Sequence, residues 1–262
     1  MKDICTDLAK EYEGLDAIVA ALDDSGWQIM TPAEGWNIKD QIRHLAYFDE
    51  RARVAVTEPE AFDRYLAEIA ANPAGHQATL EKAGRDLAPA DLLSWWRQER
   101  RALLDVLAPL DRKARFKWYG PPLSAMSLAT ARIMETWAHG QDVADALGIM
   151  RVPTDRLRHV AHLGVATFRW SFTNRQMEIP DSTVRVEITS PSGELWTWGP
   201  EHAKDLVRGP AEDFCLVVVQ RRHLADTRLA IQGDVARQWM SISQTYAGEP
   251  GTGRKAGMFA SS

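Results

Sequence analysis

Hydrophobic residues in the first two thirds of the chain recur at steps of three and four, the spacing of an amphipathic helix. Ile4, Leu8, Leu15, Val19 and Leu22 follow this spacing or sums of it. The same reading predicts helices at about residues 4–22, 38–51, 62–71, 89–107, 124–147 and 155–172. Four of those before Gly148 are long, and long helices joined by loops typically form a bundle.

The pattern changes to strict alternation after Phe172. Residues 183–189 place Val184, Val186 and Ile188 on one side, which predicts a half-buried strand. A turn at 190–193 and a second short run at 194–198 complete a predicted hairpin. Further short strands are expected at 207–209 and 228–232, with helices at 210–220 and 234–246.

These patterns predict an α+β protein with two domains. A length of 262 residues allows either one large domain or two small ones, and the change of pattern favours two. We expect a helical bundle over residues 1–172 and a small α+β domain over 173–248. The tail 249–262 is rich in Gly, Lys and Ser, so we expect it to be disordered.

Composition excludes several classes of protein. A net charge of −5 argues against a nucleic-acid binder, which needs a basic face. The longest apolar run, Cys215–Val219, is far too short to cross a membrane. The N-terminus lacks the apolar core of a signal peptide, and the chain has only two cysteines, Cys5 and Cys215. We therefore expect a cytoplasmic protein with no disulfide framework, no nucleic-acid partner and no membrane partner.

Two distant stretches carry the residue types of a metal site. Glu135 and His139 are separated by four residues, so a helix places them one turn apart on one face. His44 lies on another predicted helix and can supply a third ligand. Two histidines and one carboxylate leave a coordination position open, which is the pattern of catalytic rather than structural zinc.

The residues alone leave a second interpretation open. A glutamate and a histidine four residues apart also occur on solvated helix faces, and Asp142 extends this polar face. Apolar side chains between the two candidate ligands argue against full solvation. Gly140 in mid-helix costs roughly 1 kcal/mol relative to alanine, which suggests close packing or access to a site.

The chain resembles the mycothiol-dependent maleylpyruvate isomerase family, within the DinB-like group of metal-binding four-helix proteins. The resemblance lies in WNIKDQIRHL, which carries His44, in ETWAHGQD, which carries Glu135 and His139, and in the C-terminal α+β half. It implies a DinB-like four-helix bundle followed by a small sterol-carrier-like domain. It also implies that His44, Glu135 and His139 bind a divalent metal, usually zinc.

The resemblance further implies the chemistry. Family members use mycothiol, the small thiol of actinobacteria, as a thiolate activated on the metal. In the isomerases it adds to a double bond, permits rotation and leaves, and in related transferases it stays on a small electrophilic substrate. A coordinated thiol loses its proton at neutral pH. Asp49 and Asp142 are candidates for orienting the histidine ligands.

The family also places an arginine of the C-terminal domain in the catalytic cleft, and Arg222 matches that position best, with Arg221 adjacent. An arginine there can bind a carboxylate through two parallel hydrogen bonds. Two other functions remain open: a metal-dependent hydrolase with a metal-bound water, and a non-catalytic protein that binds a small ligand. A homodimer is a further expectation, because bundles of this kind often dimerise.

Overall fold

The computed structural model describes residues 1–259, and its contacts divide the chain into two units, Met1–Arg151 and a unit that begins at Val152. The division falls twenty-one residues before the end of the helical domain expected from sequence, 172 − 151 = 21. The difference arises because the helices after residue 152 pack on the second unit's own elements, α7 (Leu157–Ala166) on α9 (Ala211–Val218) and α8 (Phe168–Thr173) on α10 (Asp234–Ile242).

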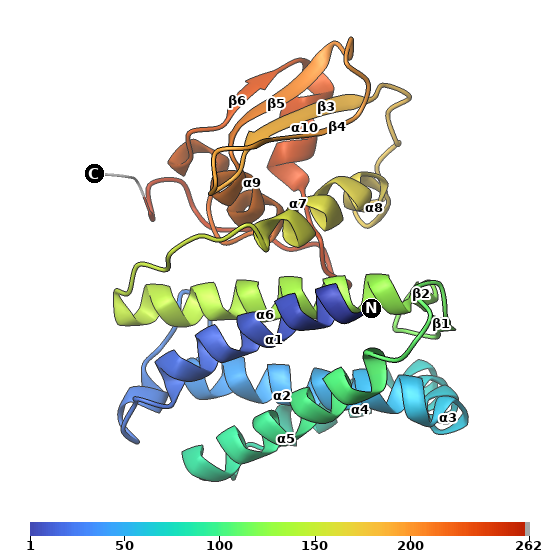
Figure 1. Cartoon of the computed structure of the whole chain (residues 1–262), viewed down its shortest axis with the longest axis vertical. Coiled ribbons are helices and arrows are strands. Elements are labelled where there is room, and N and C mark those ends of the chain that lie inside the picture. The colour runs from blue at the N-terminus through green and yellow to red at the C-terminus, as the bar shows by residue number, and fades with distance from the viewer. Residues whose placement is uncertain (260–262) are drawn as a thin grey trace. The chain divides into compact units, whose positions relative to one another are not determined.

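The first unit is built on four long helices, which Figure 1 shows side by side. They are α1 (Lys2–Val19), α2 (Ile38–Thr57), α5 (Pro89–Leu107) and α6 (Ala125–Leu147). Helix α2 packs against α5 and α6, and α1 packs against the same two helices. The buried face of each helix carries the periodic apolar residues, such as Leu8 in α1 and Trp96 in α5, so the predicted bundle is confirmed.

Local sequence explains where these helices begin and end. Asn37 caps α2, because its side chain accepts from the Asp40 amide and the Asp40 carboxylate accepts from the Asn37 amide. Ser124 caps α6 in a similar way, through the amide of Ser127. Helix α6 ends at Gly148, whose φ of 64° is a left-handed conformation that glycine adopts without strain.

Shorter elements complete the first unit. They are the 3₁₀ turn η1 (Gly26–Gln28), helices α3 (Pro59–Ala71) and α4 (Pro73–Lys82), and a two-stranded ribbon of β1 (Arg115–Phe116) and β2 (Leu123–Ser124). Helix α4 was not predicted, because Asn72-Pro73 was interpreted as the end of a helix. The pair also begins one, since Asn72 caps the Gly75 amide and Pro73 stands at the first helical position.

The second unit is a four-stranded sheet with helices. Strands β3 (Val184–Thr189), β4 (Leu195–Trp198), β5 (Asp205–Pro210) and β6 (Ala230–Gln232) lie in the order β4-β3-β5-β6. The β3–β5 pair is parallel and the other two pairs are antiparallel. The buried face carries Val186, Ile188, Trp196 and Val207, which confirms the predicted hairpin and its inward side.

The helices of the second unit are α7 (Leu157–Ala166), α8 (Phe168–Thr173), α9 (Ala211–Val218) and α10 (Asp234–Ile242), with the 3₁₀ turn η2 (Leu224–Asp226) after α9. The helix expected at 155–172 is therefore two helices, broken at Thr167, and α9 and α10 end earlier than expected. Gly164 permits close packing of α7 on α9, since a Cβ there would lie 2.8 Å from Val218.

The described part of the tail, residues 249–259, is hydrogen-bonded to the second unit, which differs from the disorder expected there. The Gly251 amide donates to Gln244, the Gly251 carbonyl accepts from Arg175, and the Gly257 amide donates to Asp226. Residues 260–262, the rest of the predicted tail, lie outside the described part of the chain.

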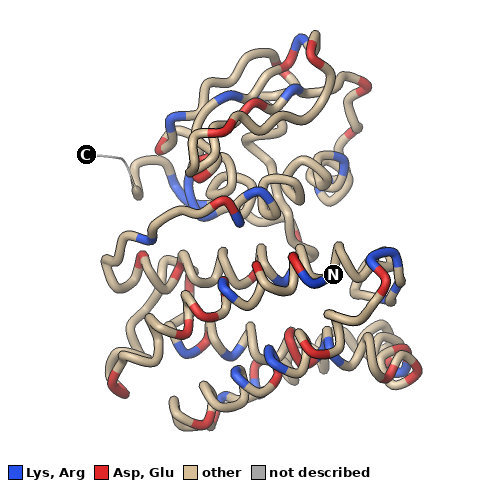
Figure 2. The backbone as a smooth tube through the Cα atoms, in the orientation of Figure 1, with Lys and Arg blue, Asp and Glu red and all other residues tan. Residues whose placement is uncertain are grey.

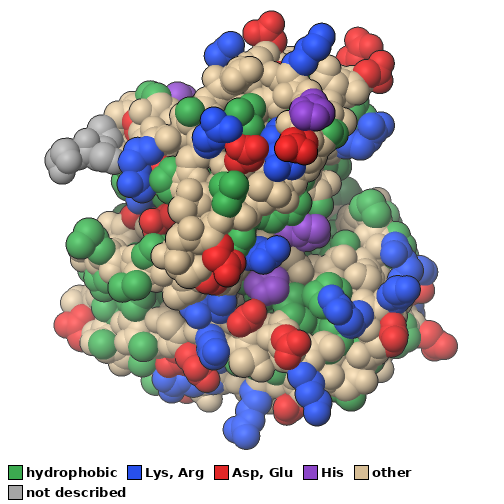
Figure 3. Space-filling model, turned by 45° about the horizontal axis from the view of Figure 1, so that its top comes forward, with side chains coloured by type: hydrophobic (Ala, Val, Ile, Leu, Met, Phe, Trp, Pro, Cys, Tyr) green, Lys and Arg blue, Asp and Glu red, His purple; other side chains and the backbone are tan. Residues whose placement is uncertain are grey.

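Charged side chains of both signs are interspersed along the bundle helices. Figure 2 shows lysine or arginine and aspartate or glutamate on both α2 and α5, and the face seen in Figure 3 has no extended area of one charge. No helix among residues 1–259 is long and apolar enough to cross a membrane.

One buried carboxylate ties the four long helices together. Asp49 of α2 accepts hydrogen bonds from Tyr12 of α1 at 2.7 Å, Trp96 of α5 at 3.1 Å and Arg132 of α6 at 2.8 Å. Asp49 is fully buried and Arg132 is 2% exposed. Burial, followed by the neighbouring Asp49 carboxylate, raises the pKa of Tyr12 well above its ordinary value, so its hydroxyl stays a donor.

Removing this carboxylate should destabilise the first unit strongly. Asp49→Ala leaves Arg132 buried without its counter-ion, and such a change costs about 3–5 kcal/mol. Urea denaturation followed by circular dichroism measures the loss in the free energy of unfolding. The control is Asp63→Ala, which removes the half-exposed partner of Lys117 and should cost at most about 1 kcal/mol. Equal losses in the two variants would contradict the role given to Asp49.

Candidate metal centre

The first unit brings His44, Glu135 and His139 together at the contact between α2 and α6. One Glu135 oxygen, Oε2, lies 3.3 Å from His44 Nε2 and 3.2 Å from His139 Nε2. One ligand atom from each residue lies within 4.8 Å of the other two. Ligands about 2.0–2.2 Å from a tetrahedral zinc lie roughly 3.3–3.5 Å apart, so the donor set fits such an ion.

Gln41 fixes the protonation of His139. The Gln41 side-chain nitrogen donates to Thr31 Oγ1 at 2.8 Å, so its Oε1 accepts from His139 Nδ1. Neutral His139 therefore carries its proton on Nδ1 and presents a lone pair at Nε2. That lone pair faces the Glu135 carboxylate, an arrangement that repels unless a cation or a proton lies between the two atoms.

The electrostatics of Glu135 suit a ligand. Burial alone raises the pKa of this carboxyl, but hydrogen bonds and charge interactions with His139 and His44 outweigh it and hold the pKa well below the ordinary value. Glu135 therefore stays ionised. A divalent ion would take the place of the protons in those hydrogen bonds, and two neutral imidazoles with one carboxylate would then leave it one net positive charge, which favours an anionic ligand.

Aromatic rings enclose the cluster. Trp36 stacks on His139 with ring centroids 6.0 Å apart and lies 5.5 Å from the His44 ring. Phe48, one turn beyond His44 on α2, lies 4.6 Å from the same imidazole. These contacts restrict rotation of the two histidines.

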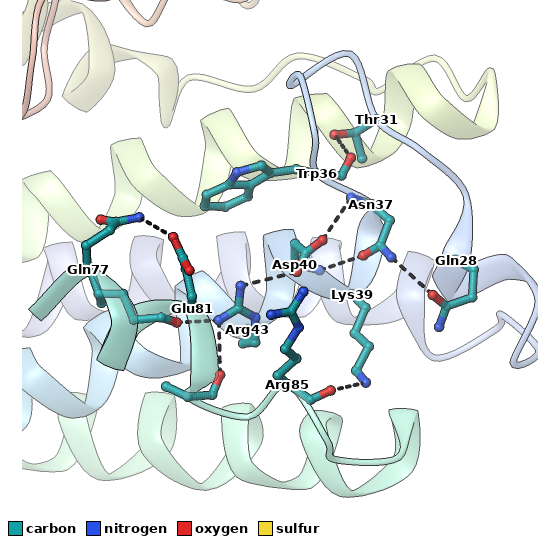
Figure 4. A network of polar contacts seen from close by, with 12 residues as sticks. Gln28, Thr31, Trp36, Asn37, Lys39, Asp40, Arg43, Gln77, Glu81 and Arg85 are labelled. Atoms are coloured by element: carbon teal, nitrogen blue, oxygen red, sulfur yellow. Dashed lines mark hydrogen bonds and ion pairs between the residues drawn. The ribbon is translucent and has the colours of Figure 1, made fainter. Parts of the chain in front are cut away.

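The segment that carries Trp36 is itself held in place by polar contacts (Figure 4). The Asn37 amide side chain donates to Gln28, and Thr31 Oγ1 donates to the Trp36 carbonyl. Lys39 donates to the Arg85 carbonyl in the connection between α4 and α5. The start of α2 is therefore fixed on both sides, which positions Gln41 and His44.

The sequence found the three candidate ligands but not the group that orients His139. Asp49 binds Tyr12, Trp96 and Arg132 and lies one turn beyond the site. Asp142 is buried, and its suggested role stays a prediction. Gln41 is the orienting residue that was missed, and its signal was its position three residues before His44, on the face of α2 that meets α6.

Arg222 lies after α9 in the second unit. Its guanidinium carbon lies 3.8 Å from the centre of the Phe259 ring, and Nη1 donates to the Arg221 carbonyl. The expected placement of Arg222 in a catalytic cleft, and the choice between it and Arg221, stay predictions.

Gly140 has a packing role. A Cβ at this position would lie 3.3 Å from Arg151 Nη1. Arg151 crosses α6 there, donates to the Trp137 carbonyl at 2.8 Å and pairs with Glu11 of α1. The glycine thus lets the end of the first unit lie directly against the turn of α6 that carries His139.

The first unit is thus a helical bundle with a candidate metal site, at which facing helices bring two histidines and a carboxylate together. The family model for the mycothiol maleylpyruvate isomerase N-terminal domain matches residues 8–144, which include all three clustered residues. Because the match covers more than half of the chain, the chain belongs to that family. A second model, described as wyosine base formation, matches residues 180–231.

Relatives with known sequences match this chain over nearly its whole length. The chain is 46% identical over 251 residues to uncharacterized proteins of Mycobacterium tuberculosis strains CDC 1551 and H37Rv, covering 95% of this chain and 96% of each relative. Crystal structures of the mycothiol-dependent maleylpyruvate isomerase and of a histidine-to-alanine mutant give TM-scores of 0.52 and 0.53 at 16% identity. Each alignment covers 84% of this chain and 89% of the solved chain, so this chain shares the fold of those structures.

Replacing Gln41 should weaken metal binding without unfolding the bundle. Gln41→Leu removes the acceptor that orients His139, and loss of such a partner typically costs 10–100-fold in metal affinity. Competition with a chromophoric zinc chelator measures the change. Gln77→Leu is the matched control, because Gln77 bonds only the exposed Glu81 among the contacts described for it. Equal zinc affinity in the two variants would contradict the role of Gln41.

Proposed function

We propose that this protein is a metal-dependent enzyme that uses mycothiol. It either isomerises a small electrophilic substrate or transfers the thiol to that substrate through sulfur. The observation that carries the proposal is the convergence of His44, Glu135 and His139, with Gln41 directing the Nε2 lone pair of His139 inward. Membership of the family supports the thiol, and the mycobacterial origin of its relatives fits a thiol of actinobacteria.

His44, Glu135 and His139 would hold the ion, for which zinc is our first choice. A bound divalent ion would supply the positive charge that lowers the pKa of a thiol into the neutral range. The protein's own contribution is to orient the two imidazoles, through Gln41 and the rings of Trp36 and Phe48.

For an isomerisation, the thiolate sulfur would form a bond to one carbon of an activated double bond. The electron pair of that double bond moves to the adjacent carbonyl, so the former double bond becomes a single bond and can rotate. Return of the electron pair expels the thiolate and restores the double bond. In a transfer reaction the new carbon–sulfur bond is kept, and the other carbon of the former double bond, next to the carbonyl, takes up a proton from solvent as the electron pair returns to it. Arg222 is our candidate for binding a substrate carboxylate during these steps.

Metal content per chain is the first test. We expect about one zinc or similar ion per wild-type chain by mass spectrometry, and loss of most of it in His139→Ala. The matched control is His202→Ala, which removes an exposed histidine of the second unit and should keep the ion. A wild-type protein that stays metal-free after incubation with zinc, nickel and manganese would overturn the proposal.

Activity is the second readout. With the metal bound, turnover of maleylpyruvate or another small electrophile should require mycothiol. Turnover that is independent of the thiol would replace the thiol mechanism by metal-dependent hydrolysis.

A further inference from the structure

A separate hollow lies further along α2, between α2, α3 and α4 of the first unit. Its volume is about 680 Å³. Its walls combine tyrosine rings with hydrogen-bonding groups of several kinds: Tyr47, Arg51, Tyr65, Glu68, Asn72, His76 and Thr79, with Ile69, Ala71 and Gly75. The mechanism described above makes no use of these residues.

Charge in this hollow is balanced. Arg51 pairs with Glu50, and the carboxylate of Glu68 also lines the wall. The Arg51 guanidinium lies over the rings of Tyr47 and Tyr65, with its central carbon 5.5 and 5.4 Å from the ring centres. Among the described residues, the buried Arg51 Nε has no hydrogen-bond partner. Such a set of donors and acceptors around aromatic rings suits a neutral hydroxylated ligand better than an anion.

The hydroxyls of Tyr47 and Tyr65, which line the hollow, form one network with the Tyr119 hydroxyl. Tyr65 lies in the centre, 2.8 Å from the Tyr47 hydroxyl, 3.0 Å from the Tyr119 hydroxyl and 3.4 Å from His76 Nδ1. Burial raises the pKa of each of the three hydroxyls, so all stay protonated. When Tyr65 donates to His76, Tyr47 and Tyr119 both donate to Tyr65, and none of the three hydroxyl protons is left for a ligand. When Tyr65 donates to Tyr47 instead, the Tyr47 hydroxyl proton is available to a ligand. The network can therefore either donate to a ligand hydroxyl or accept from it.

The hollow and the metal centre share one face of α2. His44, Tyr47, Phe48 and Arg51 stand at positions i, i+3, i+4 and i+7. At a rise of 1.5 Å per residue, His44 and Arg51 are about 10 Å apart along the helix axis. Phe48 contacts both His44 and the hollow-lining Tyr47, at 4.6 and 5.3 Å between ring centres, so a chain of aromatic contacts joins the two places.

From this placement we propose that the hollow binds the polyhydroxylated end of the thiol cosubstrate while its sulfur reaches the metal centre. The inference rests on the proposed function, and it adds the binding determinants of the cosubstrate: Tyr47, Tyr65, Arg51, Glu68 and His76. Mycothiol, a thiol carried on a sugar conjugate, has this chemistry.

The test measures binding of S-methyl mycothiol, whose blocked sulfur cannot be deprotonated, by isothermal titration calorimetry. Tyr65→Phe removes the central hydroxyl and keeps the ring, so we expect the affinity to fall about 5- to 10-fold with zinc content unchanged. The control is Tyr246→Phe in the second unit, which removes a hydroxyl that donates to Gln220 and should leave binding unchanged. Circular dichroism checks that each variant is folded.

Two further measurements separate the possible failures. His139→Ala should lose zinc but still bind S-methyl mycothiol. If the wild type contains no zinc but still binds S-methyl mycothiol, and Tyr65→Phe weakens that binding, only the metal mechanism is wrong. Equal affinity in wild type and Tyr65→Phe, with zinc present, would overturn the hollow as the subsite. Succinate serves as an anionic probe. If it binds there, and binds more tightly in Glu68→Gln, the hollow is an anion site and the inference is wrong.

Discussion

The side chain of Asp49 is the interaction on which the first unit depends. One carboxylate on α2 accepts a hydrogen bond from each of the other three long helices, through Tyr12, Trp96 and Arg132. Apolar packing is non-directional and tolerates small shifts of a helix along its axis. Three hydrogen bonds to a single buried group do not tolerate such a shift, because a displaced donor would remain buried and unpaired.

This constraint reaches the metal centre through the register of α2 against α6. Gln41 meets His139, His44 meets Glu135, and Asp49 meets Arg132. Residue numbers rise along one helix as they fall along the other, so these are three successive steps of one antiparallel contact. A slip of one turn would separate all three pairs together. The same packing of α2 on α6 therefore sets the Asp49–Arg132 ion pair and the contacts among the candidate ligands and Gln41.

Periodicity was sufficient to predict the bundle and the hairpin, because each element has one clearly apolar face. The break at Thr167 escaped prediction, since apolar residues continue on both sides of it and no glycine or proline marks it. Helix α4 escaped for the opposite reason: it buries none of its side chains and so has no apolar stripe to find. Topology, such as the parallel pairing of β3 with β5, depends on contacts between segments that no local pattern reports.

The candidate site shows the same division. Glu135 and His139 were visible because four-residue spacing is a local property of one helix. The role of Gln41 was not, since a glutamine on a mixed helix face has many uses and only the register across α6 selects one. Asp49 had been suggested as a histidine partner from its residue type, whereas its burial among Tyr12, Trp96 and Arg132 gives it a structural role.

The closure of the first unit by Arg151 has a consequence for how such proteins can evolve. Arg151 joins α6 to α1 at the last residue of that unit, and Gly140 gives it room. The three candidate ligands and Gln41 all precede Arg151 in the sequence. The two family models respect it as well, one ending at residue 144 and the other beginning at 180. Gene fusion could thus exchange the C-terminal module while the candidate metal site of the first unit stays intact.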